Sequence, residues 1–287
     1  PEEVPMAFWV EWCALVRSIN PEAYIVGEIW KAKPEWLDGR TFDALMNYPF
    51  AEIALEWIGN REHKISASEA ARRFAAHRET YPSEVTYALQ NLVDSHDTDR
   101  LVSKLHNPDR AYDSGNREQE DQTYDGSKPP ARAYQQARLV ALLQMTSPGA
   151  PMIYYGDEVG LWGSDDPNNR KPMLWKDLEP YEESGMAVMD DHLAFYQAAV
   201  SLRNDFTALR TGSIETILTD DEQDVMAFVR EDDANRLLVI LNANDDPAKI
   251  SVPVDGEWRQ IFGVSSGPPQ DCVLSGISGA VYLHSKP

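Results

Sequence analysis

The chain has 287 residues, of which 43% are hydrophobic and 25% are charged, a composition typical of folded globular proteins rather than disordered ones. Its 26 Lys and Arg face 47 Asp and Glu, so the formal charge is −21, and repulsion from phosphates argues against nucleic acid and anionic membranes as partners. The sequence has no long apolar run and opens without the basic and apolar regions of a signal peptide, so we expect a cytoplasmic protein.

Helices and short apolar strands are expected to alternate over the first 204 residues. The segment 10–19 places apolar residues at helical spacing, and Asn20 and Pro21 then end the helix. Short buried strands that alternate with helices are typical of a parallel sheet, so the predicted fold class is α/β. The other predicted helices are 68–81, 131–145 and 191–204, and the predicted strands are 23–28, 41–46, 88–93 and 150–155.

The pattern changes near residue 205, where short β-rich runs begin, separated by Asp, Asn, Gly and Pro. We therefore expect an α/β domain over 1–204 and a small antiparallel β-sandwich domain over 205–287. The polar stretch 107–130 is predicted to be a long loop. Cys13 and Cys272 are too few for a disulfide framework or a metal cluster and are expected to be buried thiols. The predicted strands of the second domain are 225–230, 236–241, 250–254 and 280–283.

Acidic residues follow two of the predicted parallel strands, at the end where α/β proteins bind ligands. Glu28 follows the first strand, and the segment 94–100 after the third contains three Asp, one His and one Arg. A carboxyl pair in an aromatic-walled cleft can cleave a glycosidic bond, because one carboxyl protonates the leaving oxygen. Taken alone, a strand-end Glu is more often a solvated or salt-bridged group. The segment lacks the His spacing of a zinc site, so no metal is expected.

Several separate segments, in order along nearly the whole chain, resemble one family. They are VGEIW at 26–30, FDALMNYPF at 42–50, NLVDSHD at 91–97, SPGAPMIYYGDE at 147–158, and DPNNRKPM at 166–173 with Trp175. The sequence resembles the α-amylase superfamily, glycoside hydrolase family 13, and most closely its neopullulanase, cyclomaltodextrinase and maltogenic amylase branch. This resemblance implies the second half of a TIM (β/α)8 barrel followed by a small all-β C-terminal domain.

The resemblance also implies roles for single residues. Glu28 would be the general acid/base at the end of the fifth barrel strand. Asp97 would be an acid that binds sugar hydroxyls and helps to distort the ring at the cleavage subsite. His96 would hydrogen-bond the same sugar, and Trp30 would be an aromatic platform on the leaving-group side. The substrate implied by these roles is an α-glucan oligosaccharide.

Four further residues are candidates for substrate binding. Asp166 and Arg170 would hold the glucose at the non-reducing end, and the alternative is a local ion pair that only orders their loop. Tyr48 and Tyr155 are the other two candidates. For Tyr155, the alternative is that it packs at the eighth barrel strand and caps it, together with Tyr154, Asp157 and Glu158.

The family's nucleophile is an Asp at the end of the fourth barrel strand, and no Asp here has the corresponding context. We therefore expect a fragment of a retaining glycosidase that is inactive by itself, because a double displacement requires the nucleophile. No cofactor is expected, and a structural Ca²⁺ is conceivable only in the missing half. A half barrel exposes sheet edges and an apolar face, so self-association or pairing with the missing half is expected.

Two other interpretations stay open at this point. One is a non-catalytic glucan-binding or ancillary protein with an amylase-like fold, and the other is an unrelated α/β protein. The presence of Glu28, His96 and Asp97 favours the glycosidase, and the number of matching segments argues against an unrelated protein. The preferred glucan and linkage, and the balance of hydrolysis and transglycosylation, do not follow from the sequence.

Overall fold

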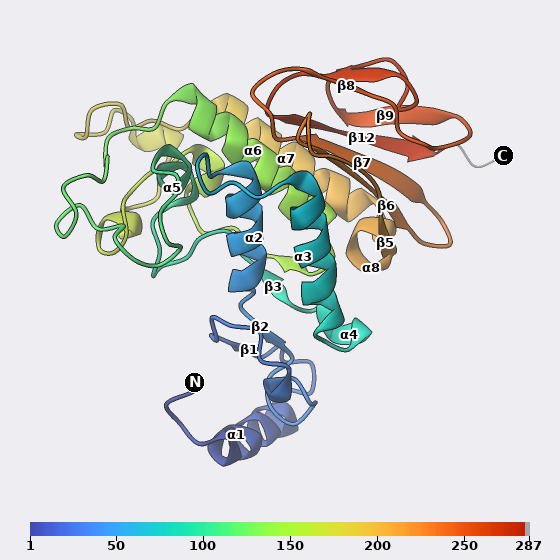
Figure 1. The fold of residues 1–287 in the computed structure, drawn as a ribbon. Helices are drawn as coiled ribbons and strands as arrows, with labels where there is room; N and C mark the ends of the chain where they lie inside the picture. The colour runs from blue at the N-terminus through green and yellow to red at the C-terminus, as the bar shows by residue number, and fades with distance from the viewer. Residues whose placement is uncertain (285–287) are drawn as a thin grey trace.

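A computed structural model describes residues 1–284 and shows short parallel strands in the N-terminal part (Figure 1). β1 pairs with β2 and β3 pairs with β4, both in parallel. A parallel bridge between Met46 and Gln90 joins the two pairs, so the order is β1-β2-β3-β4. The predicted parallel arrangement is confirmed, although each strand is only two residues long. The strands are β1 (Val26–Gly27), β2 (Ala44–Leu45), β3 (Gln90–Asn91) and β4 (Ala150–Pro151).

The longer helices lie close to the predicted segments, with one addition. They are α1 (Met6–Ile19), α2 (Tyr48–Ile58), α3 (Ala67–Glu79), α6 (Ala131–Thr146) and α7 (Asp190–Asp205). α3 begins after Ser66, whose side chain accepts a hydrogen bond from the backbone N–H of Glu69 and so caps the helix. The shorter helical turns are α4 (Ser83–Thr86), α5 (Leu101–His106), α8 (Thr207–Thr211), η1 (Pro34–Trp36), η2 (Asp157–Val159), η3 (Asn168–Arg170) and η4 (Lys176–Leu178).

The addition is α2, which the sequence prediction lacks. Pro49 lies in its first turn, where the missing N–H has no intrahelical partner to lose. Most of its side chains are buried, so it has no polar face from which a helical period could be recognised. At its other end, the indole N–H of Trp57 donates to Asp224 of the C-terminal part at 2.8 Å.

Two antiparallel sheets form the C-terminal part (Figure 1). A hydrophobic core lies between them, with Val225 and Leu238 from the larger sheet facing Ile250 and Leu274 from the smaller one. This is the expected β-sandwich. The larger sheet has the order β5 (Ser213–Asp220), β6 (Val225–Glu231), β7 (Arg236–Asn242), β12 (Ser278–His284) and β9 (Trp258–Gly263), and the smaller has β10 (Ser265–Ser266), β11 (Cys272–Leu274) and β8 (Ala248–Ile250).

The larger sheet is buried on both faces because side chains alternate along a strand. Along β6, Val225, Ala227 and Val229 enter the core of the sandwich, whereas Met226 and Phe228 join the core that the helices form. The two parts therefore share one continuous apolar core. The predicted division at residue 205 itself stays a prediction.

One predicted strand is misplaced. The strand expected at 250–254 ends at Ile250, and the N–H of Val252 instead donates to the carbonyl of Pro269 at 2.9 Å. Pro253 has no N–H with which to continue a ladder. Cys13 and Cys272 are free and buried, as expected. Among residues 1–284, no helix is long and apolar enough to cross a membrane.

Candidate active site

Glu28 lies directly after β1, and His96 and Asp97 lie in the loop after β3. Because the carboxyl ends of parallel strands meet at one edge of a sheet, the three side chains converge. One nitrogen or oxygen atom from each lies within 4.8 Å of the others. This is well inside the separation of about 10 Å expected for carboxyls that share a glycosidase site. Glu28 and Asp97 are 35% and 42% exposed, so a ligand can reach both.

Arg170 holds the Asp97 side of this group. Its Nη2 donates to Oδ1 of Asp97 at 2.8 Å, and its Nε donates to the backbone carbonyl of His96 at 2.9 Å. Nε2 of His96 lies 3.3 Å from Oδ2 of Asp97 and 3.9 Å from Oε1 of Glu28. The Asp97 carboxylate is therefore oriented by a guanidinium on one oxygen and an imidazole on the other.

Trp30 and Tyr48 support the Glu28 side. Their rings stack in parallel, with centroids 3.9 Å apart, and Trp30 is half-buried. The Tyr48 hydroxyl lies 3.3 Å from Oε1 of Glu28 and 3.2 Å from Oγ of Ser95. Burial raises the pKa of Tyr48, so this hydroxyl stays protonated and can donate. Tyr48 has no exposed surface, so it reaches Glu28 and not the open face where a substrate-binding residue would lie.

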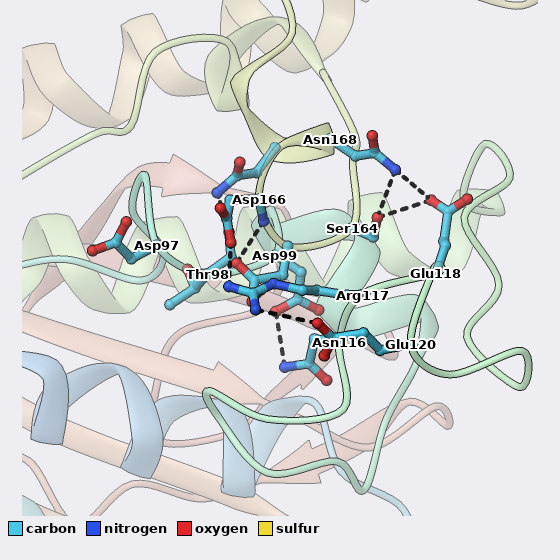
Figure 2. A network of polar contacts seen from close by, with 12 residues as sticks. Asp97, Thr98, Asp99, Asn116, Arg117, Glu118, Glu120, Ser164, Asp166 and Asn168 are labelled. Atoms are coloured by element: carbon cyan, nitrogen blue, oxygen red, sulfur yellow. Dashed lines mark hydrogen bonds and ion pairs between the residues drawn. The ribbon is translucent and has the colours of Figure 1, made fainter.

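Asp166 and Arg170 do not pair with each other, so the local ion pair considered for them does not form. Arg117 binds the Asp166 carboxylate through Nη2, and its Nε lies 3.4 Å from Asp165 (Figure 2). Arg170 instead contacts Asp97. Arg117 belongs to the long loop 107–130, which gives no regular pattern, so sequence reasoning missed it.

The loop that carries His96 and Asp97 is fixed from below by buried polar groups. Nδ2 of Asn169 donates to the carbonyls of His96 and Thr98 at 2.8 and 2.7 Å. The carbonyl of Asn169 in turn accepts a hydrogen bond from Nε of Arg100 at 2.8 Å. Asn169 is fully buried, and it also escaped the sequence analysis, because an Asn in a polar loop looks like an ordinary turn residue.

Arg100 is fully buried near two carboxyls. Its Nη1 lies 3.2 Å from Oδ1 of Asp157, and Asp94 accepts the backbone N–H of Leu101 at 2.8 Å. Burial raises the pKa of both Asp94 and Asp157, and the charge of Asp94 raises the pKa of Asp157 further. Oδ1 of Asp94 and Oδ2 of Asp157 are buried and have no hydrogen-bond partner among the described residues, so the raised pKa values favour the protonated form of these carboxyls.

Tyr155 lies at the edge of this buried cluster. Its ring is 39% exposed, and its hydroxyl donates to the carbonyl of Lys171 at 2.7 Å. The Arg100 guanidinium lies over the Tyr155 ring at 4.8 Å. Asp157 is buried, and Glu158 accepts the N–H of Gly156 at 2.8 Å. Of the residues considered at this strand end, Tyr155 is the one with a half-open ring that a sugar could cover.

The described residues contain one group that could offer three ligands to a metal ion, and it is Glu28, His96 and Asp97. The set of two carboxylates and one imidazole is chemically able to bind a divalent cation. An ion there would occupy the oxygens that acid catalysis needs. Exposed acidic groups of this kind are common without a metal.

Comparison with known proteins shows the family to which the chain belongs. Residues 2–212 match the catalytic domain of alpha amylase, and residues 214–274 match the maltogenic amylase C-terminal domain. The sequence is 33% identical over 265 residues to a cyclomaltodextrinase of Geobacillus thermopakistaniensis, covering 92% of this chain and 39% of that protein. It is 32% identical over 252 residues to neopullulanase 2 of Thermoactinomyces vulgaris, covering 88% of this chain and 37% of that protein.

A solved structure gives the same result. The type III pullulan hydrolase from Thermococcus kodakarensis superposes with a TM-score of 0.77 at 29% identity, over 97% of this chain and 42% of that chain. The chain thus spans less than half the length of these relatives, and its match to the catalytic domain extends over more than half of its own residues. The chain belongs to the α-amylase family, and its relatives include the cyclomaltodextrinase, neopullulanase and maltogenic amylase branch.

Proposed function

We propose that the chain carries the acid/base part of an active site that cleaves α-1,4 bonds in α-glucan oligosaccharides. The observation that carries this proposal is the convergence of Glu28, His96 and Asp97 within 4.8 Å at the carboxyl ends of β1 and β3. Membership of the α-amylase family and the names of the relatives, cyclomaltodextrinase and neopullulanase, support a glucan as the substrate.

Glu28 is the proton donor in this mechanism. The Tyr48 hydroxyl at 3.3 Å from Oε1 orients the carboxyl, which is open to a ligand. Protonation of the glycosidic oxygen improves the leaving group while positive charge develops at the anomeric carbon. Trp30 is half-buried with one face stacked on Tyr48, and it is the aromatic ring that we assign to the sugar that leaves.

Asp97 binds hydroxyl groups of the sugar that is cleaved. Its carboxylate is already held by Arg170 and faces His96, an arrangement that presents several acceptors and donors to a polyol. In this proposal Asp166, which Arg117 holds, supplies acceptors for the glucose at the non-reducing end. The half-open ring of Tyr155 completes the sugar-binding set.

A retaining mechanism also needs a carboxylate nucleophile about 5–5.5 Å from the acid. Of the described residues, Asp97 approaches Glu28 this closely, and its contacts with Arg170 and His96 suit binding rather than attack. The nucleophile therefore comes from a part of the catalytic domain other than these residues. In this proposal the four parallel strands are half of a (β/α)8 barrel, and the cytoplasmic location stays a prediction.

Glucose release from maltotriose tests the proposal with two proteins. One is the 287-residue chain, and the other is the complete enzyme, meaning the same residues joined to the segment that supplies the nucleophile. We expect glucose from the complete enzyme and none from the chain alone. Release by the chain alone would contradict the nucleophile assignment. A complete enzyme that binds maltotriose without cleaving it would instead support a non-catalytic glucan-binding protein.

An exposed apolar stripe on α1 supports the proposal that another protein segment packs against the chain. Phe8, Trp12, Leu15 and Ile19 are 50%, 39%, 60% and 78% exposed. Their spacing of four, three and four residues places them on one face of the helix. An exposed stripe of this kind is typical of a surface that another protein segment covers. We propose that the rest of the barrel covers this stripe in the complete enzyme. When the chain is alone, a second copy of the chain covers it instead.

A further inference from the structure

A cleft of about 750 Å³ lies between α3, α4 and the first sandwich strand, β5. Pro148, which precedes β4, is part of its wall, whereas Glu28 and Asp97 follow their strands. The cleft is therefore at the opposite end of the parallel strands from the candidate active site. Its lining residues come from both the helical part and the sandwich, whose α3 and β5 lie side by side (Figure 1).

Arg78 on α3 is the unusual residue of this wall. Its guanidinium is half-buried, and burial lowers its pKa. Within residues 1–284 it makes no side-chain hydrogen bond and no ion pair. Arg72, one and a half turns earlier on the same helix, shows the usual arrangement, with two hydrogen bonds of 2.7 Å to Glu69. A guanidinium taken out of water without a partner is costly, so Arg78 is a candidate for pairing with a ligand.

Two further arginines make the surroundings of Arg78 positive. Arg203 and Arg230 are buried and donate only to backbone carbonyls, among them those of Met145 and Gly212 at 2.8 and 3.0 Å. Burial lowers their pKa values to about 10 and about 9, and the charges of Arg203 and Arg78 contribute to the lower pKa of Arg230. No carboxylate within ion-pair distance neutralises these three among the described residues, in a chain with a net charge of −21.

The rest of the lining supplies donors and one opposing charge. Ser83, Thr216 and Thr219 face the cleft with hydroxyls that make no hydrogen bond to other described residues. Glu79 is the acid in the lining, and it forms no ion pair with Arg78. A planar guanidinium is suited to an oxyanion, to which it can donate two parallel hydrogen bonds, and the hydroxyls are suited to the polar body of the same ligand.

We propose that this cleft binds the phosphate group of a small molecule through Arg78, with the hydroxyls of Thr216 and Thr219, further along β5, facing the body of that molecule. The volume of about 750 Å³ is that of a pocket for an organic ligand and is much more than a single phosphate fills. The source is therefore a phosphorylated small molecule with a polar body rather than free phosphate. The ligand contacts both α3 and β5, so it stabilises the junction between the two parts of the chain.

Calorimetric titration with three probes tests the proposal: glucose 6-phosphate, inorganic phosphate and glucose, at equal ionic strength. We expect glucose 6-phosphate to bind, and Arg78→Gln to weaken this binding at least about tenfold. Arg78→Lys keeps the charge and loses the planar fork, so it should weaken binding less. Arg73→Gln, on the same helix but outside the lining of the cleft, is the matched control and should bind as the unmodified chain does.

The possible results distinguish a phosphorylated small molecule from free phosphate, and both from the absence of an oxyanion site. Equal affinity for inorganic phosphate and glucose 6-phosphate would support the oxyanion site and assign its source to free phosphate. Absence of binding by either phosphate probe would overturn the site. Equal losses in Arg78→Gln and Arg73→Gln, or binding of glucose alone that Arg78→Gln leaves unchanged, would overturn it as well. Circular dichroism shows whether each variant is folded, and Arg78→Lys replaces Arg78→Gln if the latter is not. The test does not depend on glucan cleavage.

Discussion

Glu28 and Asp97 are close in space but have different neighbours. Glu28 meets the neutral hydroxyl of Tyr48, and Asp97 meets the charged guanidinium of Arg170. The hydroxyl can hold the carboxyl that transfers a proton in place, whereas the guanidinium fixes the orientation of a carboxylate that accepts hydrogen bonds from sugar hydroxyls. Two carboxyls at the same edge of the sheet can therefore have different roles.

Substitution of Arg170 tests the sugar-binding role of the Asp97 side. In the complete enzyme, we expect Arg170→Ala to raise the KM for maltotriose by at least about tenfold, because Asp97 loses the group that orients it. The unfolding free energy should change by less than about 1 kcal/mol, since this ion pair is exposed. Arg40→Ala, which removes a surface pair with Asp38, is the control. A large loss of stability with an unchanged KM would indicate an arginine that only orders its loop.

The site residues that could be predicted from the sequence are those that follow strands. Glu28, His96 and Asp97 follow apolar runs that the sequence marks clearly, so their convergence could be predicted. Arg117 and Asn169 could not be predicted, because they reach the site from irregular loops whose path depends on tertiary contacts. The burial of Tyr48 at the start of α2 could not be predicted either, because the ring of Trp30 that covers it comes from another segment of the chain.

Among the helices and strands, too, some could be predicted from the sequence and others could not. Amphipathic helices such as α3 could be recognised from their spacing, whereas α2 has too few exposed residues to show a period. Edge strand β5 alternates only weakly between buried and exposed positions, and it was missed as well. Central strands β6 and β7 are nearly continuous apolar runs and were recognised because both of their faces are buried.

α7 contains a buried histidine that makes stability depend on pH. His192 packs edge-on against Tyr134 of α6, with ring centroids 5.6 Å apart, and accepts a hydrogen bond from Arg138 at 3.2 Å. Burial lowers its pKa to about 4, the charge of Arg138 acts in the same direction, and Asp191 opposes it. Between pH 6.5 and 4 the unfolded chain binds a proton on this imidazole and the folded chain does not.

Urea unfolding at pH 7, 6 and 5 measures the effect. The contribution of His192 to the unfolding free energy should fall as pH falls, by up to about 1.4 kcal/mol per pH unit, whereas the raised pKa values of Asp94 and Asp157 act in the opposite direction. His192→Gln keeps an acceptor for Arg138 and removes the titration, so its loss of stability over this range should be smaller. His77, whose pKa burial also lowers to about 4, keeps part of the slope. The same slope in His192→Gln as in the unmodified chain would refute this assignment.

For the whole molecule, the helical part and the sandwich share a core, while the opposite side of the chain presents the apolar stripe of α1. We expect the 287-residue chain to associate with itself through this stripe. Leu15→Glu should raise the dissociation constant at least about tenfold in analytical ultracentrifugation, because it places a charge in an apolar contact. Val264→Glu, at an 80% exposed position in the sandwich, is the control. A monodisperse monomer at all concentrations would contradict the covered surface.

The central claim is that Glu28 donates the proton in α-glucan cleavage, and the turnover of Glu28→Gln in the complete enzyme tests it most directly. The amide keeps the shape of the side chain and cannot protonate a leaving oxygen. Turnover of maltotriose should therefore fall at least about a hundredfold, while the loss for an aryl maltoside with an acidic leaving group, which needs no proton, should be much smaller. Near-normal turnover of maltotriose by Glu28→Gln, or equal losses on both substrates, would contradict the account.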